Sequence, residues 1–216
     1  MKKDLTELVF ILDRSGSMSG LELDTIGGYN SMMEKQGAGH GEVFVTTVLF
    51  DDEIEILHDR ADLKVMAAIT ENEYFVRGTT ALLDAMGKTI SMVANVQKNL
   101  AGSERAEKVI IVITTDGMEN ASREYSYEKI KKMVERQKAK YGWEFIFLGA
   151  NIDAVAEASR FGIEEDRAAR FNSDAKGTAI NYDVVGEAVS KLRSDRTMDR
   201  RWKKRIEDDY KDRGGR

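Results

Sequence analysis

The 216-residue sequence contains no cysteine and only two histidines, His40 and His58. The absence of cysteine excludes disulfides, thiolate metal sites and cysteine nucleophiles, and it favours a cytoplasmic protein over a secreted one. Two histidines are too few for a zinc site built mainly on imidazole, and we expect both to be ordinary surface residues. Any metal site must therefore use oxygen ligands, which favours Mg2+, with Mn2+ and Ca2+ as alternatives.

Long hydrophobic runs are also absent from the sequence. A transmembrane helix needs about 20 consecutive apolar residues, and no run comes near that length. The apolar stretch Leu8–Leu12 is too short for the core of a signal peptide and ends at Asp13. We therefore expect a protein that does not enter a membrane and is not exported. The apolar fraction of 42% still allows a buried core.

The net charge of −5 is distributed unevenly along the chain. Residues 191–216 contain eleven Lys/Arg and six Asp/Glu, a balance of +5, so the remainder carries −10. An acidic body does not attract nucleic acid, and we do not expect a nucleic-acid partner for it. The basic tail, in which Trp202 stands between Lys and Arg residues, leaves nucleic-acid binding open as a minor alternative. Trp202, Ile206 and Tyr210 stand four apart, so the tail could instead form a short docking helix.

Short, continuous apolar runs predict strands that are buried on both faces of a parallel sheet. These runs are Leu8–Leu12, Val43–Phe50, Val109–Ile113 and Phe145–Leu148. Residues Glu53–Leu57 alternate as a half-buried strand does, after a turn at Asp51-Asp52. We expect this last segment to be an antiparallel edge strand.

Apolar residues at helical spacing predict the crossover helices between these strands. A capping box at Ser19–Glu22 would start the first helix. Ser126 would cap a later helix and Asp153 a short one, and the last helix would cover Ile180–Leu192. The alternating order predicts an α/β fold, with a doubly wound, mostly parallel central sheet and helices on both faces. We assign residues 1–195 to one domain and residues 196–216 to a charged C-terminal tail.

Three loops that carry oxygen side chains should meet at one end of the sheet, where ligands bind in open α/β folds. The first is Asp13–Ser17, in which Gly16 allows a sharp bend. The second is Gly78-Thr79-Thr80, and the third is Thr114–Gly117. Together they offer two carboxylates and several hydroxyls, which suits Mg2+ with some of its waters retained. So few carboxylates would leave the ion seeking one more anionic ligand.

At these positions the sequence resembles the von Willebrand factor A domain and its metal-ion-dependent adhesion site. The matching residues are far apart in the chain, which makes the pattern specific: Asp13, Ser15, Ser17, Thr80 and Asp116. The flanking segments Phe10–Met18 and Thr80–Ala85 are also similar, and the resemblance covers residues 5–195 in element order. It is closest to intracellular prokaryotic and phage members, including those similar to tellurite-resistance proteins.

The resemblance implies a divalent-metal-dependent protein-binding module, and not an enzyme. Ser15, Ser17 and Thr80 would ligate the metal through their hydroxyls, and Asp13 and Asp116 would act mostly through water. A partner protein, for example one of an ATPase-associated system, would supply a carboxylate as the last ligand. We favour Thr80 over its neighbour as the ligand because it directly precedes the helix. Residues expected on the rim of the ligand site are Arg14, Met18, Arg77, Thr79 and Glu119.

Other functions remain open from the sequence alone. Magnesium beside Asp13 and Asp116 could support phosphoryl transfer or hydrolysis. Against this, Ser15 stands where haloacid-dehalogenase-type phosphatases carry a second aspartate, and the chain has no Gly-x-x-x-x-Gly-Lys loop. A further alternative is self-association, in which a carboxylate of Glu207–Asp209 enters the metal site of another copy.

Overall fold

The structure is a computed structural model, and it describes residues 1–195 and 197–214. Its centre is a six-stranded sheet, whose strands are β1 (Lys2–Asp13), β2 (Glu42–Phe50), β3 (Ile54–Asp62), β4 (Ala106–Thr115), β5 (Glu144–Ala150) and β6 (Ala168–Phe171). The α-helices are α1 (Glu22–Gly37), α2 (Leu82–Asn99), α3 (Tyr127–Tyr141), α4 (Ala154–Arg160), α5 (Ala175–Asp195) and α6 (Lys204–Asp212). Three short 3-10 helices are η1 (Gly16–Met18), η2 (Glu165–Arg167) and η3 (Arg200–Lys203).

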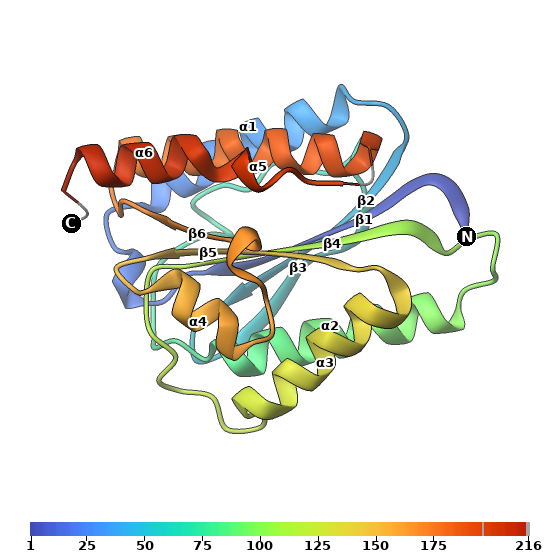
Figure 1. Ribbon diagram of the computed structural model, residues 1–216, viewed down its shortest axis with the longest axis horizontal. Coiled ribbons are helices and arrows are strands. Elements are labelled where there is room, and N and C mark those ends of the chain that lie inside the picture. Colours follow the sequence, from blue (N-terminus) through green and yellow to red (C-terminus); the bar gives the residue numbers. More distant parts are fainter. Residues whose placement is uncertain (196, 215–216) are drawn as a thin grey trace.

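The strand order is β3-β2-β1-β4-β5-β6. Strand β3 pairs antiparallel with β2, and every other neighbouring pair is parallel. Helices α1, α5 and α6 cover one face of the sheet, and α2, α3 and α4 cover the other (Figure 1). The predicted fold class, a mostly parallel α/β sheet with one antiparallel edge strand, is therefore confirmed. The five parallel strands all end on the same side, which is where the candidate site lies.

The core forms two apolar layers, one on each face of the sheet. Along β1, Leu8, Phe10 and Leu12 pack under α1 and α5, while Val9 and Ile11 pack under α2 and α3. All five side chains are at most 1% exposed. A strand sends successive side chains to opposite faces, so a strand covered on both sides must be apolar at every position. This is the physical reason for the continuous apolar run.

Two of the three predicted helix caps are confirmed, and one is wrong. The Ser126 hydroxyl accepts a hydrogen bond from the Lys129 amide at the start of α3, and Asp153 caps α4 in the same way. The capping box at Ser19 does not form, because α1 begins at Glu22 with Leu21 in the N-cap position. Ser19 instead ends η1, and the Glu22 carboxylate reaches back to the Gly20 amide at 2.7 Å.

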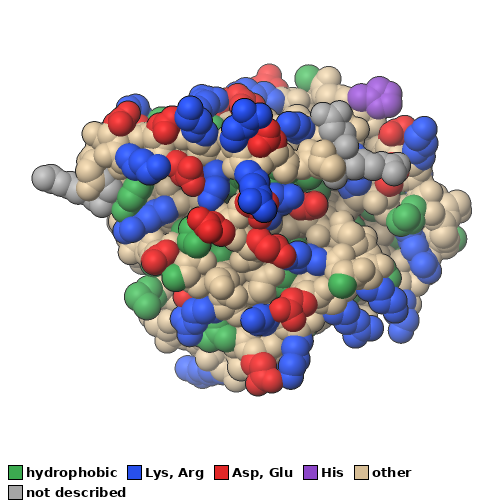
Figure 2. All heavy atoms as spheres, in the orientation of Figure 1, with side chains coloured by type: hydrophobic (Ala, Val, Ile, Leu, Met, Phe, Trp, Pro, Cys, Tyr) green, Lys and Arg blue, Asp and Glu red, His purple; other side chains and the backbone are tan. Residues whose placement is uncertain are grey.

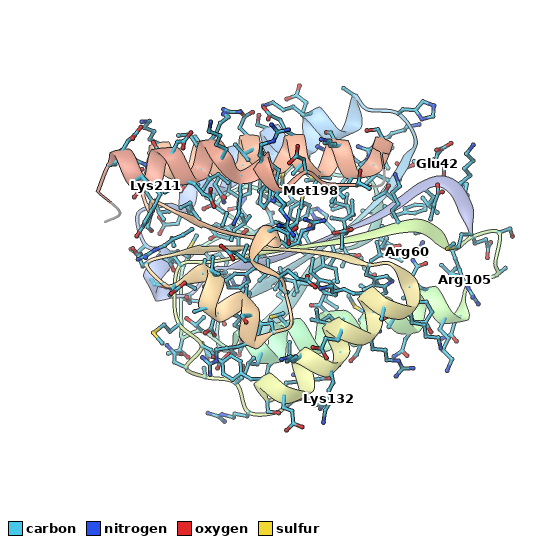
Figure 3. All side chains as sticks on the ribbon, viewed as in Figure 1. Glu42, Arg60, Arg105, Lys132, Met198 and Lys211 are labelled. Carbon is cyan, nitrogen blue, oxygen red and sulfur yellow. The ribbon has the colours of Figure 1, made fainter. Side chains whose placement is uncertain are left out.

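The segment after α5 packs against the rest of the molecule. Trp202 and Ile206 join the apolar layer over β6 and α5, and Met198, labelled in Figure 3, is also buried there. The Lys203 ammonium donates to the carbonyls of Glu165 and Ala168 at 2.8 Å, so it covers the outer edge of β6. The surface over α5 and α6 carries acidic and basic side chains mixed together (Figure 2). In the described part of the chain, no helix is long and apolar enough to cross a membrane.

One carboxylate that was considered for self-association is already engaged. Asp209 has an 8% exposed side chain and pairs with Lys176 at 2.9 Å and with Arg213. It also accepts a hydrogen bond from the Asn172 amide at 3.0 Å. Asp209 therefore holds α6 onto the loop after β6 and is not free to enter another copy's metal site. Asp208 is exposed.

Candidate functional site

The hydroxyls of the three predicted loops meet at the carboxyl end of the sheet. Ser15 and Ser17 follow β1, and Thr80 precedes α2. The Ser15 and Ser17 hydroxyl oxygens lie 3.1 Å apart, and the Thr80 hydroxyl donates to that of Ser15 at 3.0 Å. These three residues and the two aspartates of the predicted set thus belong to one cluster, because Asp13 bonds to the Ser15 amide and Gly117, next to Asp116, lies against Ser17 and Thr80.

Asp13 is fixed at the end of β1 by two hydrogen bonds. One carboxylate oxygen accepts from the Ser15 amide at 2.7 Å, and the other accepts from the Thr115 hydroxyl at 2.5 Å. The residue is only 1% exposed. Burial raises the pKa of Asp13 to about 6, and the hydrogen bonds from Ser15 and Thr115 offset part of that rise. The carboxylate is therefore well oriented but poorly solvated.

Asp116 is a buried carboxylate that lacks well-formed hydrogen bonds. It is 2% exposed, and among the described residues neither of its carboxylate oxygens has a hydrogen-bond partner of good geometry. Burial raises its pKa, although the Ser17 and Ser173 hydroxyls lie near enough to offset part of the rise. A buried carboxylate without partners is expensive, and such groups are normally paired or bind a metal. This feature marks Asp116 as a candidate ligand.

Gly117 leaves room beside the hydroxyl cluster. A Cβ atom at this position would lie 2.9 Å from the Ser17 hydroxyl oxygen and 3.2 Å from that of Thr80. The first contact is shorter than real Cβ atoms tolerate, so a side chain here would push into the cluster. The Thr-Asp-Gly turn after β4 therefore needs glycine for close approach, as well as aspartate for charge.

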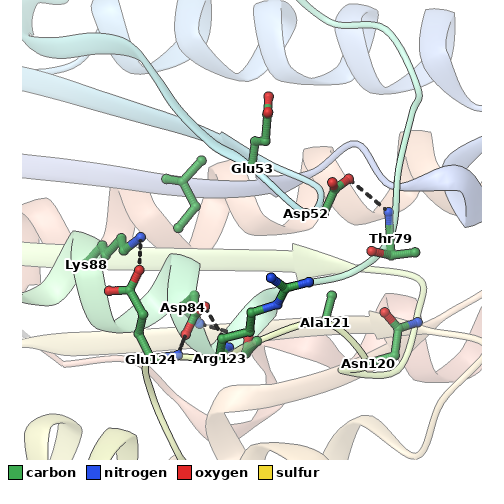
Figure 4. Close-up of a pocket in the computed structure, with 11 residues that line it drawn as sticks. Asp52, Glu53, Thr79, Asp84, Lys88, Asn120, Ala121, Arg123 and Glu124 are labelled. Atoms are coloured by element: carbon green, nitrogen blue, oxygen red, sulfur yellow. Dashed lines mark hydrogen bonds and ion pairs between the residues drawn. The ribbon is translucent and has the colours of Figure 1, made fainter.

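Thr80 and Thr79 have different surroundings, which distinguishes the two candidate ligands. Thr80 is 3% exposed, and its amide donates to the Asn120 side chain at 2.9 Å while its hydroxyl joins the cluster. Thr79 is exposed, and its amide donates to Asp52 at 3.3 Å. It borders a groove between the β2–β3 turn, α2 and residues 120–124 (Figure 4). The structure brings Thr80, and not Thr79, to the hydroxyl cluster.

Three of the residues expected on the rim are placed differently. Arg14 is 0% exposed and Met18 is 3% exposed, so both lie beneath the surface. In the Asp-x-Ser-x-Ser loop, the oxygen side chains face one way and the intervening Arg14 side chain faces the protein interior. Glu119 is half-buried and accepts hydrogen bonds from the amides of Leu83, Ala121 and Ser122, so it fixes the start of α2. Arg77 has a 41% exposed side chain and pairs with the Asp51 carboxylate at 2.7 Å.

The sequence did not predict the roles of several residues that support the cluster. Thr115 orients Asp13, Asn120 holds the Thr80 amide, and the Tyr74 hydroxyl donates to the Asp13 carbonyl at 2.5 Å. Asp51, expected only as part of a turn, is 0% exposed and binds two arginines. Burial would raise the pKa of Asp51, but hydrogen bonds from Arg77, the Glu53 amide and Arg14 outweigh burial and lower it.

The donor set suits a hard divalent cation that keeps some water. It consists of three hydroxyls and two buried carboxylates, and in the described residues no group of three or more His, Cys, Asp or Glu side chains could hold a metal. Sites of this kind are therefore not of the carboxylate-cage type. Hydroxyl and carboxylate oxygens suit Mg2+, Mn2+ or Ca2+ by ligand hardness. The unpartnered oxygens of Asp116 are the observation that fits a cation here.

Comparison with known proteins agrees with this fold. Three similar solved structures have TM-scores of 0.58–0.59 and sequence identities of 12–14%. A mutant of the PilB minor pilin from Streptococcus sanguinis has a TM-score of 0.59 at 12% identity, covering 89% of this chain and 63% of that one. The von Willebrand factor type A structure from Catenulispora acidiphila has 0.58 at 13%, covering 87% and 43%.

The third structure is proximal thread matrix protein 1 from the mussel byssus with a zinc-occupied MIDAS motif. Its TM-score is 0.58 at 14% identity, and the match covers 88% of this chain and 47% of that one. This chain thus spans less than two thirds of each of the three chains, and identities this low show the fold alone. A search of curated proteins gives no significant match. The family model for the von Willebrand factor type A domain matches residues 7–182, so this chain belongs to that family.

Proposed function

We propose that this domain is a protein-binding module that depends on a divalent cation. Ser15, Ser17 and Thr80 would hold the cation with their hydroxyls, and Asp13 and Asp116 would supply negative charge. The observation that carries the proposal is the buried carboxylate of Asp116, which has no hydrogen-bond partner of good geometry among the described residues and lies near the Ser17 hydroxyl. The zinc reported at the MIDAS motif of the mussel protein supports a divalent ion in this position.

The partner would contribute a carboxylate to the bound cation. Two carboxylates and three neutral hydroxyls leave the ion short of oxygen ligands, so an acidic side chain from outside would be attracted strongly. We propose Mg2+ as the ion, with Mn2+ and Ca2+ as alternatives. We further propose a cytoplasmic setting, supported by the lack of cysteine, and a partner in an ATPase-associated system. The likeness to intracellular prokaryotic and phage members remains a prediction from the sequence.

The geometry of Asp13 supports binding over phosphoryl transfer. Both of its carboxylate oxygens accept hydrogen bonds, from the Ser15 amide and the Thr115 hydroxyl, and it is 1% exposed. A nucleophile must reach its substrate, whereas Asp13 is buried and held by a protein donor at each oxygen. Incubation with phosphate esters and Mg2+ tests the alternative. Phosphate release above background that disappears in Asp13→Asn would establish an enzyme instead.

Calorimetric titration of Mg2+ and Mn2+ tests the proposed function directly. We expect one ion per chain for the wild type and a loss of at least about tenfold in affinity for Asp116→Asn. Asp208→Asn is the matched control, because it removes an exposed carboxylate far along the chain and should bind normally. Acidic peptides should bind only when metal is present. If the wild type binds no ion, with or without peptides, the family resemblance is one of fold only.

A further inference from the structure

Asp51 is a fully buried carboxylate that joins two of the loops of the candidate site. It directly follows β2 at the turn into β3 and is 0% exposed. One of its oxygens accepts from the Glu53 amide at 2.7 Å, which closes the turn. The other accepts from two arginine Nε atoms, those of Arg14 at 2.8 Å and Arg77 at 2.7 Å. The two arginines belong to different loops.

The first loop is held through Arg14, which stands between Asp13 and Ser15. Its side chain is 0% exposed, and a buried guanidinium needs a counter-charge close by. Asp51 provides that charge within the protein, and Glu55 adds a second contact at 2.7 Å from a half-exposed position. The Arg14 backbone is anchored as well, since its amide donates to the Phe50 carbonyl at 2.8 Å. The position of Ser15 is thus tied to the end of β2.

The second loop is held through Arg77 and the backbone just after Thr80. Arg77 donates to Asp51 through Nε and to Glu53 through Nη2, at 2.7 Å each. The Ala81 amide donates to the Asp51 carbonyl at 2.9 Å. Asp51 therefore contacts this loop on both sides of Thr80, three residues before it and one residue after it.

The two loops also touch each other where Asp51 joins them. The Arg77 amide donates to the Arg14 carbonyl at 2.9 Å, and the Gly16 amide donates to the Gly78 carbonyl at 3.2 Å. Gly78 has a positive φ of 65°, and a Cβ atom there would lie 3.3 Å from the Asp51 Cβ and 1.9 Å from the Asp52 carboxylate. The loops are packed closely against this turn, so a change at Asp51 is transmitted to both.

We infer that Asp51 is a positioning residue of the proposed metal site, which holds Ser15 and Thr80 at the spacing that a cation needs. Their hydroxyls lie 3.0 Å apart although 65 residues separate them in the chain. Asp51 touches neither hydroxyl and acts through Arg14, Arg77 and the Ala81 amide. The inference rests on the proposed function and adds to it the element that sets the geometry of the ligands.

The test compares three variants by titration with Mn2+ alone. Asp51→Asn keeps the size of the side chain and removes the charge shared by the arginines. Glu7→Gln is the matched control: Glu7 is 1% exposed and binds Arg60 at 2.9 Å and Gln97 at 3.0 Å. Glu7 lies six residues before Asp13 on β1, about 20 Å away. Its partner Arg60, labelled in Figure 3, marks the end of the sheet that is opposite the candidate site. Arg77→Gln removes the ion pair between the partly exposed Arg77 side chain and Asp51.

We expect Asp51→Asn to lower the Mn2+ affinity about 10- to 100-fold, as loss of a supporting residue around a metal site does. Arg77→Gln should give a smaller loss, and Glu7→Gln should bind as the wild type does. An unchanged affinity in Asp51→Asn overturns the inference, and so does an equal loss in Glu7→Gln, which would show general destabilisation. If Asp51→Asn fails to fold, Arg77→Gln decides by the same criterion.

Amide hydrogen exchange without metal separates this inference from the proposed function. The amides of Gly16 and Ala81 report the contact between the loops and the contact with Asp51. Both should exchange at least about tenfold faster in Asp51→Asn than in Glu7→Gln. If the wild type binds no ion but this difference appears, the proposed function fails while the positioning of the two loops stands. Equal exchange in the two variants overturns the inference whether or not metal binds.

Discussion

The metal-free domain should become more stable when Asp13 loses its charge. Burial raises the pKa of this carboxyl from 3.8 to about 6 in the folded protein. Between these two values the unfolded chain releases its proton while the folded chain keeps it, so rising pH favours unfolding. The stability that the protonated Asp13 carboxyl contributes is therefore fully present below about pH 3.8, and it is lost as the pH rises through about 6. A shift of about two pKa units corresponds to about 3 kcal/mol.

Asparagine fits the same position without leaving a donor unpaired. Its side-chain oxygen can accept from the Ser15 amide, and its NH2 group can donate to the Thr115 hydroxyl. Thr115 can then donate to the Gly117 carbonyl, 3.1 Å away. Neutral hydrogen bonds are weaker than those of a carboxylate, which reduces the gain. We expect Asp13→Asn to stabilise the metal-free protein by about 1 to 3 kcal/mol at pH 7.

Urea denaturation in EDTA, followed from pH 3.5 to pH 8, measures this effect. The difference in unfolding free energy between Asp13→Asn and the wild type should grow between about pH 4 and pH 6 and then stay constant. Excess Mg2+ should reverse the order, because a ligand at about 1,000 times its Kd stabilises the wild type by about 4.1 kcal/mol, which exceeds the gain expected for Asp13→Asn. A variant that is less stable in EDTA at every pH, or a difference that does not change with pH, would refute the reasoning.

The remaining predictions concern packing. Ile206→Ala should destabilise the protein by about 2 to 4 kcal/mol, because the side chain is 2% exposed in the apolar layer under α6. Asp208→Ala, on the exposed side of α6, should change the unfolding free energy little, and urea denaturation of the two variants measures the difference. Gly28→Ala should cost about 1 to 3 kcal/mol, because its Cβ would lie 2.4 Å from the Tyr182 ring. Gly27→Ala has nothing within 4 Å and should stabilise α1 by about 0.5 to 1 kcal/mol, and equal melting temperatures for these two glycine variants would contradict the assigned helix packing.

The fold could be predicted because its signals are local. Runs such as Val109–Ile113 are short, β-branched and apolar at every position, which is the composition of a strand covered on both faces. The caps at Ser126 and Asp153 were also predictable, since each bonds to an amide three residues ahead. The pattern at Ser19 has the same form and fails. There Ser19 is the C-cap of the 3-10 helix η1 (Gly16–Met18), and no local pattern reveals that turn.

The candidate ligands could be predicted, but their surroundings could not. Alternate residues of the loop after β1 face the site, which is why Asp13, Ser15 and Ser17 were found together. The same alternation sends Arg14 inward, where it is 0% exposed. Its burial depends on Asp51, which is 37 residues away and looks like an ordinary turn residue in the sequence. Contacts between distant loops are set by the fold, so the pairing of a carboxylate with two arginines has no local signature.

The buried acidic residues near the site differ in the direction of their pKa shifts, and therefore in their effect on stability. Asp51 is neutralised by arginines, and its pKa lies below the usual value, so its charge stabilises the folded protein at neutral pH. The pKa values of Asp13 and Asp116 are raised by burial, so their charges destabilise it. The unfavourable charges of Asp13 and Asp116 thus lie where a cation would relieve them. Binding and folding are then linked: an ion that lowers these two pKa values stabilises the fold by an amount that grows with the ratio of the free ion concentration to Kd.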